Sequence, residues 1–496
     1  MSEEKVFRLG VRPPLEVVDK LPTPEEVFNI PKLTTWNLFA KVLGPAVIAL
    51  GAAIGSGEWL MGPSVAALYG LFLFWLVIPG AFLQTVFNVS FSRVTLATGE
   101  PPITYFTRAK PGPILWVWVL LILVWGQLVW PGWASAAATG LGAMILGRIP
   151  GAADAVFVRL LGTALFIICL IICLFGHKIE RTLEIVMWAC VIFVLVALIF
   201  VVAPLSVTGE ALSEMARGIV SFGYMPKGVD IFLVAGWWAY IAYATGNNFI
   251  IGNFYRDKGY GMSYLVGYIP AIIGGKKTPV SPIGKTFKIT PENLVTWKRW
   301  MRILYYDQWG IFFTGALLGM FLPSLIIRSL VPVGTKLPAW GIAAHMSEAF
   351  AAKVGPWGFY FICLIGFLIL FSTQLQVVDV LMRNTVDLIW SVSEKARKIA
   401  KEDIRVLYYS LFIIYIIWAS IAFWLEQPLV LLLLGANAAN LGGVFSVPLT
   451  MYMNKQLPKE LRPGAWEYVV LVIFWISCIF FFVAMILGQV FGIKIF

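Results

Sequence analysis

The sequence predicts an all-α membrane protein that crosses the bilayer about eleven times. Of its 496 residues 60% are hydrophobic and only 13% are charged, whereas soluble domains carry roughly 25% charged residues. Apolar runs of about 18 residues or more, each long enough to span a membrane, recur along the chain. The first and the sixth run are both interrupted by glycine and polar residues. This pairing predicts two inverted five-helix repeats followed by one extra helix.

The apolar runs also define the expected domain organisation. We expect the spans to begin near Val42, Leu71, Pro113, Arg159, Leu183, Asp230, Ile303, Trp357, Val406, Pro428 and Tyr468. The predicted divisions are an N-terminal segment (1–41), a first repeat (42–204), a second repeat (230–453) with a loop at 256–302, and an eleventh helix with the C-terminus (465–496). Because each repeat has an odd number of spans, the second repeat is inverted relative to the first.

The positive charges predict the orientation in the membrane. Most of the 37 lysines and arginines fall in segments on the same side as the N-terminus. By the positive-inside rule that side is the cytoplasm, so we expect a multi-pass protein of the plasma membrane with a cytoplasmic N-terminus. The net charge of +11 then reflects topology and indicates no nucleic-acid partner. The N-terminal segment has no apolar core, so we expect the first span itself to direct insertion.

The first span contains the most informative residue, Glu58, within Gly55-Ser56-Gly57-Glu58. A carboxylate at the centre of a membrane is costly, and Gly-Ser-Gly is a poor helix sequence, so we expect the helix to unwind here around a polar cavity. Secondary transporters build their substrate sites at such breaks. A structural role for Glu58, as a cap of the following half-helix or as the partner of a buried base, is the alternative.

The sixth span is interrupted in the same way, by Thr245, Gly246, Asn247 and Asn248. Further polar groups at membrane depth are Gln376 and Asp379 on the eighth span, Asn437 on the tenth and Gln127 on the third, where Trp125, Trp130 and Trp133 are candidates for a cavity wall. A structural ion pair with Arg383, four residues further on, is the alternative for Asp379. Asn437 and Asn440 share a helix face, and hydrogen bonding between helices explains them equally well.

Enzymatic chemistry has little support in the sequence. His177 and His345 are the only histidines, which leaves no His-based metal cluster and no Ser/His/Asp arrangement. A P-loop motif is also missing, which argues against ATP-driven transport by this chain. The five cysteines all lie in apolar runs, so we expect no disulfide framework. We therefore expect a protein that is not an enzyme and needs no cofactor.

Several segments resemble the natural-resistance-associated macrophage protein (Nramp) family of divalent-metal transporters. In the first helix the likeness is carried by Gly44-Pro45, the break from Gly55 to Glu58, and Ala66-Ala67-Leu68-Tyr69-Gly70. It extends to the sixth helix, to Ser372-Thr373 on the eighth, and to the region of Asn437 on the tenth. The resemblance implies eleven or twelve helices in the five-plus-five inverted-repeat fold of the leucine transporter (the LeuT fold).

The chain departs from this family at the metal ligands. The family has Asp-Pro-Gly-Asn in the first helix, where Gly55 here replaces the Asp and Glu58 takes the place of the Asn. In the sixth helix the family has Met-Pro-His-Asn, and this chain has Thr245, Gly246, Asn247 and Asn248. Asn437 matches a tenth-helix Gln that joins the ligand shell. The family's acidic residue on the third helix is replaced near Ala134.

The resemblance and the replaced residues together predict a hard ligand set. The expected metal ligands are Glu58, Asn247 and Asn437, which offer only oxygen atoms once the thioether is lost. Oxygen ligands suit Mg²⁺ or Mn²⁺ better than iron, zinc or copper. They equally suit Na⁺ or the ammonium group of an organic solute. Because only one carboxylate remains, a largely hydrated ion or an organic molecule is the alternative substrate.

We therefore expect an Nramp-related secondary-active transporter that works by alternating access and carries a divalent cation, Mg²⁺ or Mn²⁺ rather than Fe²⁺. The expected substrate-binding residues are Gly55, Ser56, Glu58, Thr245, Asn247, Asn248, Gln376 and Asn437, and the expected coupling residues are Glu58 and Asp379. A symporter of a small organic solute such as an amino acid is the first alternative, and an uncoupled channel or a transport-dead sensor the next. The expected partners are a small cation or polar solute and the lipid bilayer, for a monomeric protein.

Overall fold

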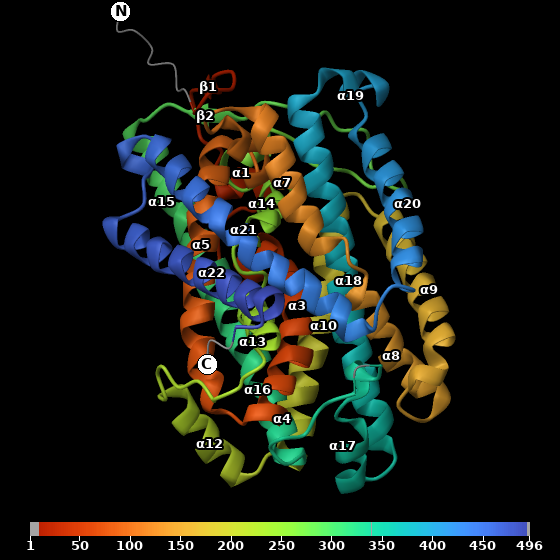
Figure 1. The fold of residues 1–496 in the computed structure, drawn as a ribbon. Coiled ribbons are helices and arrows are strands. Elements are labelled where there is room, and N and C mark those ends of the chain that lie inside the picture. The colour runs from red at the N-terminus through yellow and green to blue at the C-terminus, as the bar shows by residue number, and fades with distance from the viewer. Residues whose placement is uncertain (1–8, 339, 494–496) are drawn as a thin grey trace, which may run out of the picture.

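The computed structural model describes residues 9–338 and 340–493, which form a bundle of helices (Figure 1). Within these ranges, nine helices are long and apolar enough to cross a membrane. A tenth crossing is the pair Thr35–Val42 and Pro45–Tyr69, bent by 63°, and the shorter apolar helix Ile231–Tyr240 belongs to the interrupted sixth span. The expectation of an all-α membrane protein with about eleven spans is confirmed.

The first repeat contains five spans, two of which are built from two helices each. They are α3 (Pro45–Ala53) with α4 (Gly62–Tyr69), α5 (Val77–Thr98), α7 (Pro113–Leu128) with α8 (Gly132–Leu146), α9 (Ala155–Leu174) and α10 (Ile179–Ala197). The third span is divided at Pro131, which directly precedes α8 and, as a proline, lacks the N–H that a continuous helix needs. The connections carry α6 (Pro102–Tyr105), α11 (Ala203–Ser206) and α12 (Gly209–Ile219).

The second repeat follows the same plan and is succeeded by α22 (Ala465–Phe491). Its spans are α13 (Ile231–Tyr240) with α14 (Gly252–Lys258), α15 (Pro291–Tyr305) with α16 (Thr314–Leu330), α18 (Trp357–Val392), α20 (Ile404–Ala422) and α21 (Pro428–Gln456). The helix of the seventh span begins at Pro291, before the apolar run near Ile303. The Thr290 hydroxyl accepts a hydrogen bond from Asn293 N at 3.3 Å, and Pro291 takes the first helical position. The connections carry α17 (Ser347–Val354) and α19 (Glu394–Ile399).

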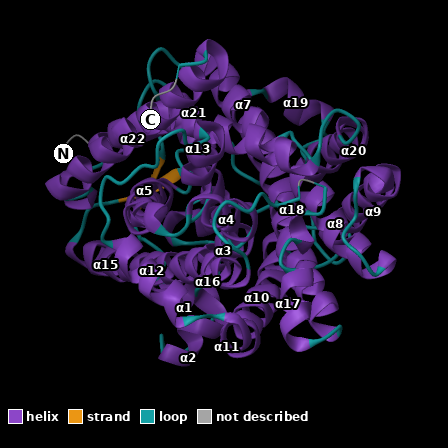
Figure 2. Cartoon of the chain, turned by 60° about the horizontal axis from the view of Figure 1, so that its bottom comes forward, coloured by secondary structure: helices purple, strands orange, loops and turns teal. Residues whose placement is uncertain are grey.

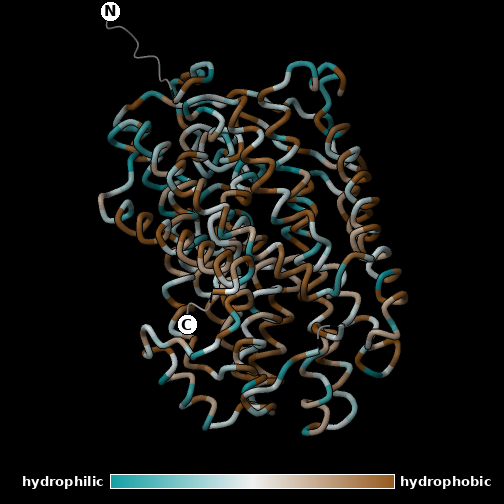
Figure 3. The backbone as a smooth tube through the Cα atoms, in the orientation of Figure 1, coloured by the Kyte–Doolittle hydropathy of each residue, from teal (hydrophilic) through white to brown (hydrophobic). Residues whose placement is uncertain are grey.

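The connecting segments gather at two opposite ends of the bundle. At the end drawn at the top of Figure 1 lie α1 (Pro24–Phe28), α19 and a small sheet, in which β1 (Glu16–Val18) pairs in parallel with β2 (Lys285–Phe287). The short α2 (Thr35–Asn37) precedes the first span, and α12 and α17 lie at the opposite end. Figure 3 shows mostly hydrophobic helices and more hydrophilic segments at the top, around α19.

The first span occupies the centre of the bundle. In the end-on view of Figure 2, α3 and α4 are surrounded by α5, α10, α16 and α18. Every residue of α3 is buried. A lipid-facing helix exposes an apolar stripe, so complete burial shows that the first span is enclosed by protein and lies where a substrate site is expected.

Candidate functional site

The first span is broken as the sequence predicts. Helix α3 ends at Ala53, and the chain resumes as a wide helical turn over Ser56–Met61 that leads into α4. Gly55 connects the two pieces, and a Cβ at this position would lie 2.4 Å from Oγ1 of Thr373 on α18. Only glycine therefore lets the break pack against the eighth span.

The sixth span is broken over a longer stretch. Helix α13 ends at Tyr240 and α14 begins at Gly252, and between them Ala242 and Gly246 have φ angles of 70° and 46°. These values lie in the left-handed region that favours glycine, so Ala242 holds a strained backbone at the centre of the bundle. Such strain is typical of functional sites.

The two breaks touch each other. A Cβ on Gly57 would lie 2.1 Å from the carbonyl oxygen of Tyr240, so the backbones of the first and sixth spans approach as closely as glycine allows. The interrupted helices thus leave backbone groups facing one another deep in the protein. This is the arrangement from which inverted-repeat transporters form a substrate site.

A small cavity lies beside this contact. It is lined by Ala52, Ala53, Ser56, Gly57, Gln127, Leu128, Trp133, Tyr240, Tyr243, Ala244, Thr373, Gln376 and Val377. These residues come from the first, third, sixth and eighth spans. About 20 Å³ is available to water-sized molecules, which is room for about one water.

The cavity wall offers hydroxyl and amide groups and aromatic rings. The Trp133 indole donates a hydrogen bond to the Ser56 hydroxyl at 3.0 Å, and the Gln376 amide donates to the Tyr243 hydroxyl at 2.7 Å. The remaining oxygen of Gln376 is buried and has no partner among the described residues. An unsatisfied buried oxygen beside a cavity is suited to a cation, an N–H group or a water.

Glu58 lies behind this wall, on the side of the seventh span. Its side chain packs against Gly319 of α16, where a Cβ would lie 3.2 Å from Glu58 Cγ. The residue is fully buried, and neither carboxylate oxygen has a hydrogen-bond partner among the described residues. The backbone amides of Gly55, Glu58 and Ala242 approach the carboxylate without reaching hydrogen-bond geometry. Glu58 is thus a buried acid between the two breaks, and no described base pairs with it.

The expected site residues of the sixth break, Thr245, Asn247 and Asn248, are not part of the cavity wall. Gln84 on the second span donates to the Thr245 hydroxyl at 3.1 Å, and Asn248 donates to the side-chain oxygen of Gln84 at 3.0 Å. Asn247 turns the other way and donates to the side-chain oxygen of Gln127 at 2.6 Å. In this conformation these three side chains join the sixth break to the second and third spans.

Asn437 also lies outside the cavity wall. Its amide donates to the backbone oxygens of Phe232 and Leu433 at 3.1 and 3.0 Å, and the bond to Phe232 ties α21 to α13, the first half of the sixth span. None of the three expected metal ligands, Glu58, Asn247 and Asn437, lines the cavity. Within residues 9–338 and 340–493, no three His, Cys, Asp or Glu side chains gather in a way that could hold a metal ion.

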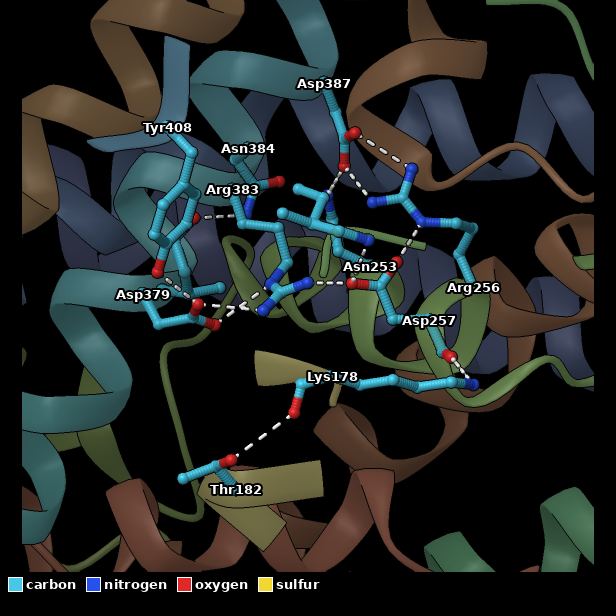
Figure 4. Close-up of polar contacts among 12 residues, drawn as sticks. Lys178, Thr182, Asn253, Arg256, Asp257, Asp379, Arg383, Asn384, Asp387 and Tyr408 are labelled. Carbon is cyan, nitrogen blue, oxygen red and sulfur yellow. Dashed lines mark hydrogen bonds and ion pairs between the residues drawn. The ribbon is translucent and has the colours of Figure 1, made fainter. Parts of the chain in front are cut away.

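Asp379 belongs to a buried cluster of charges nearer the α19 end (Figure 4). Its two carboxylate oxygens accept hydrogen bonds from Arg383 at 2.8 and 2.9 Å, and one also accepts from the Tyr408 hydroxyl at 2.6 Å. Arg383 also pairs with Asp257 on α14, the second half of the sixth span. The ion pair four residues along the helix, the structural alternative for Asp379, is therefore present.

The cavity wall contains some of the expected site residues and several others. Ser56 and Gln376 line the cavity, and Gly55 packs directly behind it. Gln127 and Trp133, noted from the sequence as weaker candidates, line it as well. The cavity-wall role of Tyr240, Tyr243 and Thr373 was not predicted. A tyrosine in an apolar span needs a partner for its hydroxyl, and that requirement is the signal that was available for the two tyrosines.

Similar folds occur among solved transporter structures. A crystal structure of a mutant of the Eremococcus coleocola manganese transporter has a TM-score of 0.58 and 11% identity, over 96% of this chain and 91% of that one. A structure of MhsT in complex with L-phenylalanine has a TM-score of 0.54 and 15% identity, over 90% and 99%. Both are LeuT-fold transporters. The chain has the LeuT fold.

The similarity in sequence to known proteins covers less of the chain than the similarity in fold. The divalent metal cation transporter MntH of Klebsiella pneumoniae is 26% identical over 196 residues, which are 39% of this chain and 44% of that protein. The chain thus aligns with less than half the length of this curated relative. No protein-family model matches the chain.

Proposed function

We propose that the chain is an Nramp-related secondary transporter that works by alternating access and carries a hard or hydrated divalent cation, Mg²⁺ or Mn²⁺ rather than Fe²⁺. The observation that carries this proposal is the contact between the two broken helices beside a small cavity with hydroxyl and amide groups in its wall. The carboxylate of Glu58, which has no hydrogen-bond partner among the described residues, lies between the breaks. The partial similarity to MntH and the fold shared with a manganese transporter support the choice of a divalent cation.

The chemistry of the wall supports a hard ion. The polar groups around the cavity are the side chains of Ser56, Gln127, Trp133, Tyr240, Tyr243, Thr373 and Gln376, and no thioether or thiol is among the lining residues. Hydroxyl and amide oxygens bind Mg²⁺ and Mn²⁺ and have little preference for soft metals. Since no carboxylate lines the cavity, we expect a bound ion to keep part of its hydration shell, in a conformation with more room than the space for about one water found here.

Direct measurement of binding and flux tests the proposal. Titration calorimetry on the purified protein should show Mn²⁺ or Mg²⁺ binding tighter than Cd²⁺, and proteoliposomes should take up Mn²⁺ with saturable kinetics. Tight Cd²⁺ binding without Mn²⁺ binding would contradict the hard site. Uptake that rises linearly with Mn²⁺ concentration would indicate a channel, because a carrier saturates.

A small organic solute is the second candidate. Three aromatic side chains, Trp133, Tyr240 and Tyr243, form a large part of the wall, and aromatic walls suit an organic ligand or its ammonium group. If a panel of amino acids raises the melting temperature of the protein while Mg²⁺ and Mn²⁺ do not, this candidate replaces the first.

We also propose a monomer in the plasma membrane, with the end that carries β1, β2 and α19 in the cytoplasm. The excess of lysine and arginine on that side supports this orientation. In intact cells, a cysteine at Ser213 on α12 should react with an impermeant thiol reagent, and a cysteine at Lys395 on α19 should not.

A further inference from the structure

A continuous chain of buried side chains joins the sixth break to the start of the first span. Its members are Asn248 on the sixth span, Asn88 on the second, Gln308 and Asp307 on the seventh, and Tyr255 on the second half of the sixth. All five are fully buried. Polar groups this deep in a membrane protein are costly, and their default interpretation is functional.

The contacts run in one direction. Asn248 donates to Asn88 at 2.9 Å, Asn88 donates to Gln308 at 2.8 Å, Gln308 donates to the Tyr255 hydroxyl, and this hydroxyl donates to Asp307 at 2.7 Å. At the far end, Asp307 also accepts from the backbone amides of Gly44 and Ala46, at 3.3 and 3.0 Å. Asp307 thereby caps the N-terminus of α3, the first half of the first span.

The ionised carboxylate of Asp307 fixes the direction in which these hydrogen bonds are donated. An ionised carboxylate only accepts hydrogen bonds, so Tyr255 must donate to it and must accept from the nitrogen of Gln308. The oxygen of Gln308 then faces the nitrogen of Asn88, and the oxygen of Asn88 faces the nitrogen of Asn248. As a result the oxygen of Asn248 points into the sixth break, where it accepts from Ala244 N at 3.1 Å.

A proton on Asp307 allows the same hydrogen bonds to be donated in the opposite direction. A neutral carboxyl group can donate to Tyr255, whose hydroxyl then donates to the oxygen of Gln308, and each amide turns over in sequence. No proton travels along the amides, since each only rotates about its side-chain bond. At the end of the series Asn248 presents its nitrogen to the break. Ala244 N then loses its acceptor, and the oxygen of Asn248 faces the oxygen of Gln84.

We propose that Asp307 is the proton-coupling residue of this transporter, and that its protonation reverses the chain and replaces the Asn248 oxygen at the sixth break by nitrogen. This inference rests on the proposed function as a cation carrier. A cation beside Ala244, which lines the cavity, needs an oxygen ligand. The Asn248 oxygen accepts from Ala244 N and has a second lone pair to offer. Cation binding at the break and a proton on Asp307 therefore exclude each other.

The charges around Asp307 are compatible with either state. Lys258 on α14 faces it and is shared with Glu184 and, at 4.0 Å, with Glu180 on α10. The hydroxyls of Tyr255 and Tyr260 complete the titratable groups near it. Because Lys258 already pairs with Glu184, Asp307 is left with an N-terminal helix cap and one hydroxyl as its direct hydrogen-bond partners among the described residues.

The sign of the coupling follows from this exclusion. Lowering the pH adds a proton to Asp307 and weakens cation binding, by up to about tenfold per pH unit for one proton. By reciprocity, cation binding releases that proton. The carboxylate lies towards the end that carries the N-terminal segment, so the proton on that side assists release of the cation there.

Calorimetry on the purified full-length protein, with Mn²⁺ as the probe, tests this proposal. Titrations in two buffers of different ionisation enthalpy give the number of protons released per Mn²⁺. In Asp307→Asn the side chain no longer titrates, and its neutral amide no longer imposes the direction that an ionised carboxylate fixes. Mn²⁺ should therefore bind about tenfold more weakly, within the usual range of couplings, and release about one proton fewer. Asp307→Glu should keep the proton release.

The series of hydrogen bonds from Asn248 to Asp307 is tested with Asn88→Leu, which interrupts the series while Asp307 stays titratable. This variant should also release about one proton fewer, and adding Asp307→Asn to it should cause no further loss of affinity. The matched control is Asn454→Leu, because Asn454 is equally buried but donates to Ser90 O and Thr450 O outside the chain. It should release as many protons as the unmodified protein.

Two results would overturn different parts of the proposal. If Mn²⁺ binds but its proton release is unchanged in Asp307→Asn and Asn88→Leu, the coupling through Asp307 is wrong and the transporter function stands. If the losses of Mn²⁺ affinity caused by the two substitutions simply add, Asp307 acts without the series of hydrogen bonds, and the proposed reversal of their direction is wrong. Absence of Mn²⁺ binding to the unmodified protein would contradict the divalent-cation function on which the coupling rests.

Discussion

Glu58 illustrates how much a single side chain reveals before the structure is known. Its position in Gly-Ser-Gly-Glu predicted both the break and a buried acid, and the structure places an unpartnered carboxylate there. The direction of that side chain was not predictable. A helix break fixes no rotation of the following turn, and Glu58 faces Gly319 of the seventh span because that glycine leaves room for it.

Glu58→Gln should lower substrate uptake by a factor of about ten or more and leave folding intact. The amide has nearly the same shape, and since the carboxylate oxygens make no hydrogen bonds to described residues, little packing is lost. Uptake into proteoliposomes gives the effect, and the melting temperature of the purified variant confirms the fold. Kinetics equal to those of the unmodified protein would reduce Glu58 to a structural residue.

The sequence shows which of the other site residues are polar at membrane depth, but it does not show where their side chains lie. Ser56 and Gln376 line the cavity as expected, because both follow from polarity at membrane depth. Thr245 and Asn248 have the same polarity and yet satisfy their hydrogen bonds at Gln84 on the second span. Which neighbour a buried amide finds depends on the packing of distant helices, and no local pattern contains that information.

At the scale of elements, the contact between the two breaks depends on Gly57. Gly57→Ala should destabilise the protein by about 1–3 kcal/mol, because its Cβ would lie 2.1 Å from the Tyr240 carbonyl oxygen and would force the breaks apart. Gly126→Ala is the control, since a Cβ there meets nothing within 4 Å, and it should be neutral or slightly stabilising. Melting temperatures of both variants give the comparison. Equal stability would show that the breaks tolerate separation.

The loop between α16 and α17 covers the site from the end of the bundle that lies opposite α19 (Figure 1). The Trp59 indole donates to the backbone oxygen of Ala343 at 3.0 Å, and the His345 ring packs edge-on against Trp59 at 5.5 Å. The ring nitrogen Nδ1 of His345 donates to the Ile342 carbonyl oxygen at 2.6 Å. Because Trp59 lies next to Glu58, this loop is fastened directly to the first break.

The stability of the protein should fall as the pH drops from about 6.5 to about 4 through the contribution of His345. Burial lowers the pKa of His345 from 6.5 to about 4 in the folded protein, so in this range the unfolded chain binds a proton that the folded protein does not. The full loss is about 3 kcal/mol. His345→Phe keeps a ring beside Trp59 and removes the titration. Melting curves across this range should therefore show the unmodified protein losing stability relative to the variant, and parallel curves would contradict the assignment.

For the whole molecule, the sequence predicted the architecture better than the site. Runs of apolar residues and two interrupted helices indicated eleven spans in inverted repeats, since membrane depth constrains every span in the same way. The charge cluster of Arg256, Asp257, Asp379, Arg383 and Asp387 joins α14 to α18 (Figure 4). The sequence predicted only the pair four residues apart on α18, because the contacts between α14 and α18 cross more than 120 positions of the chain.

We predict that this cluster helps to close the α19 end of the bundle by holding α14 against α18, so that weakening it opens that end. Asp387 accepts two hydrogen bonds from Arg256, at 2.9 and 2.7 Å, and removing one partner of a buried pair costs about 3–5 kcal/mol. In a cysteine-free background with Ala53→Cys in the cavity wall, Asp387→Asn should raise the rate of modification by an impermeant thiol reagent at least about tenfold. Asp403→Asn, which breaks the partly exposed pair with Arg405 at the same end, is the control and should change the rate little. If both substitutions leave Ala53→Cys equally protected, the cluster is not part of the closure, and the α19 end must be held shut by the packing of α3 against its neighbours.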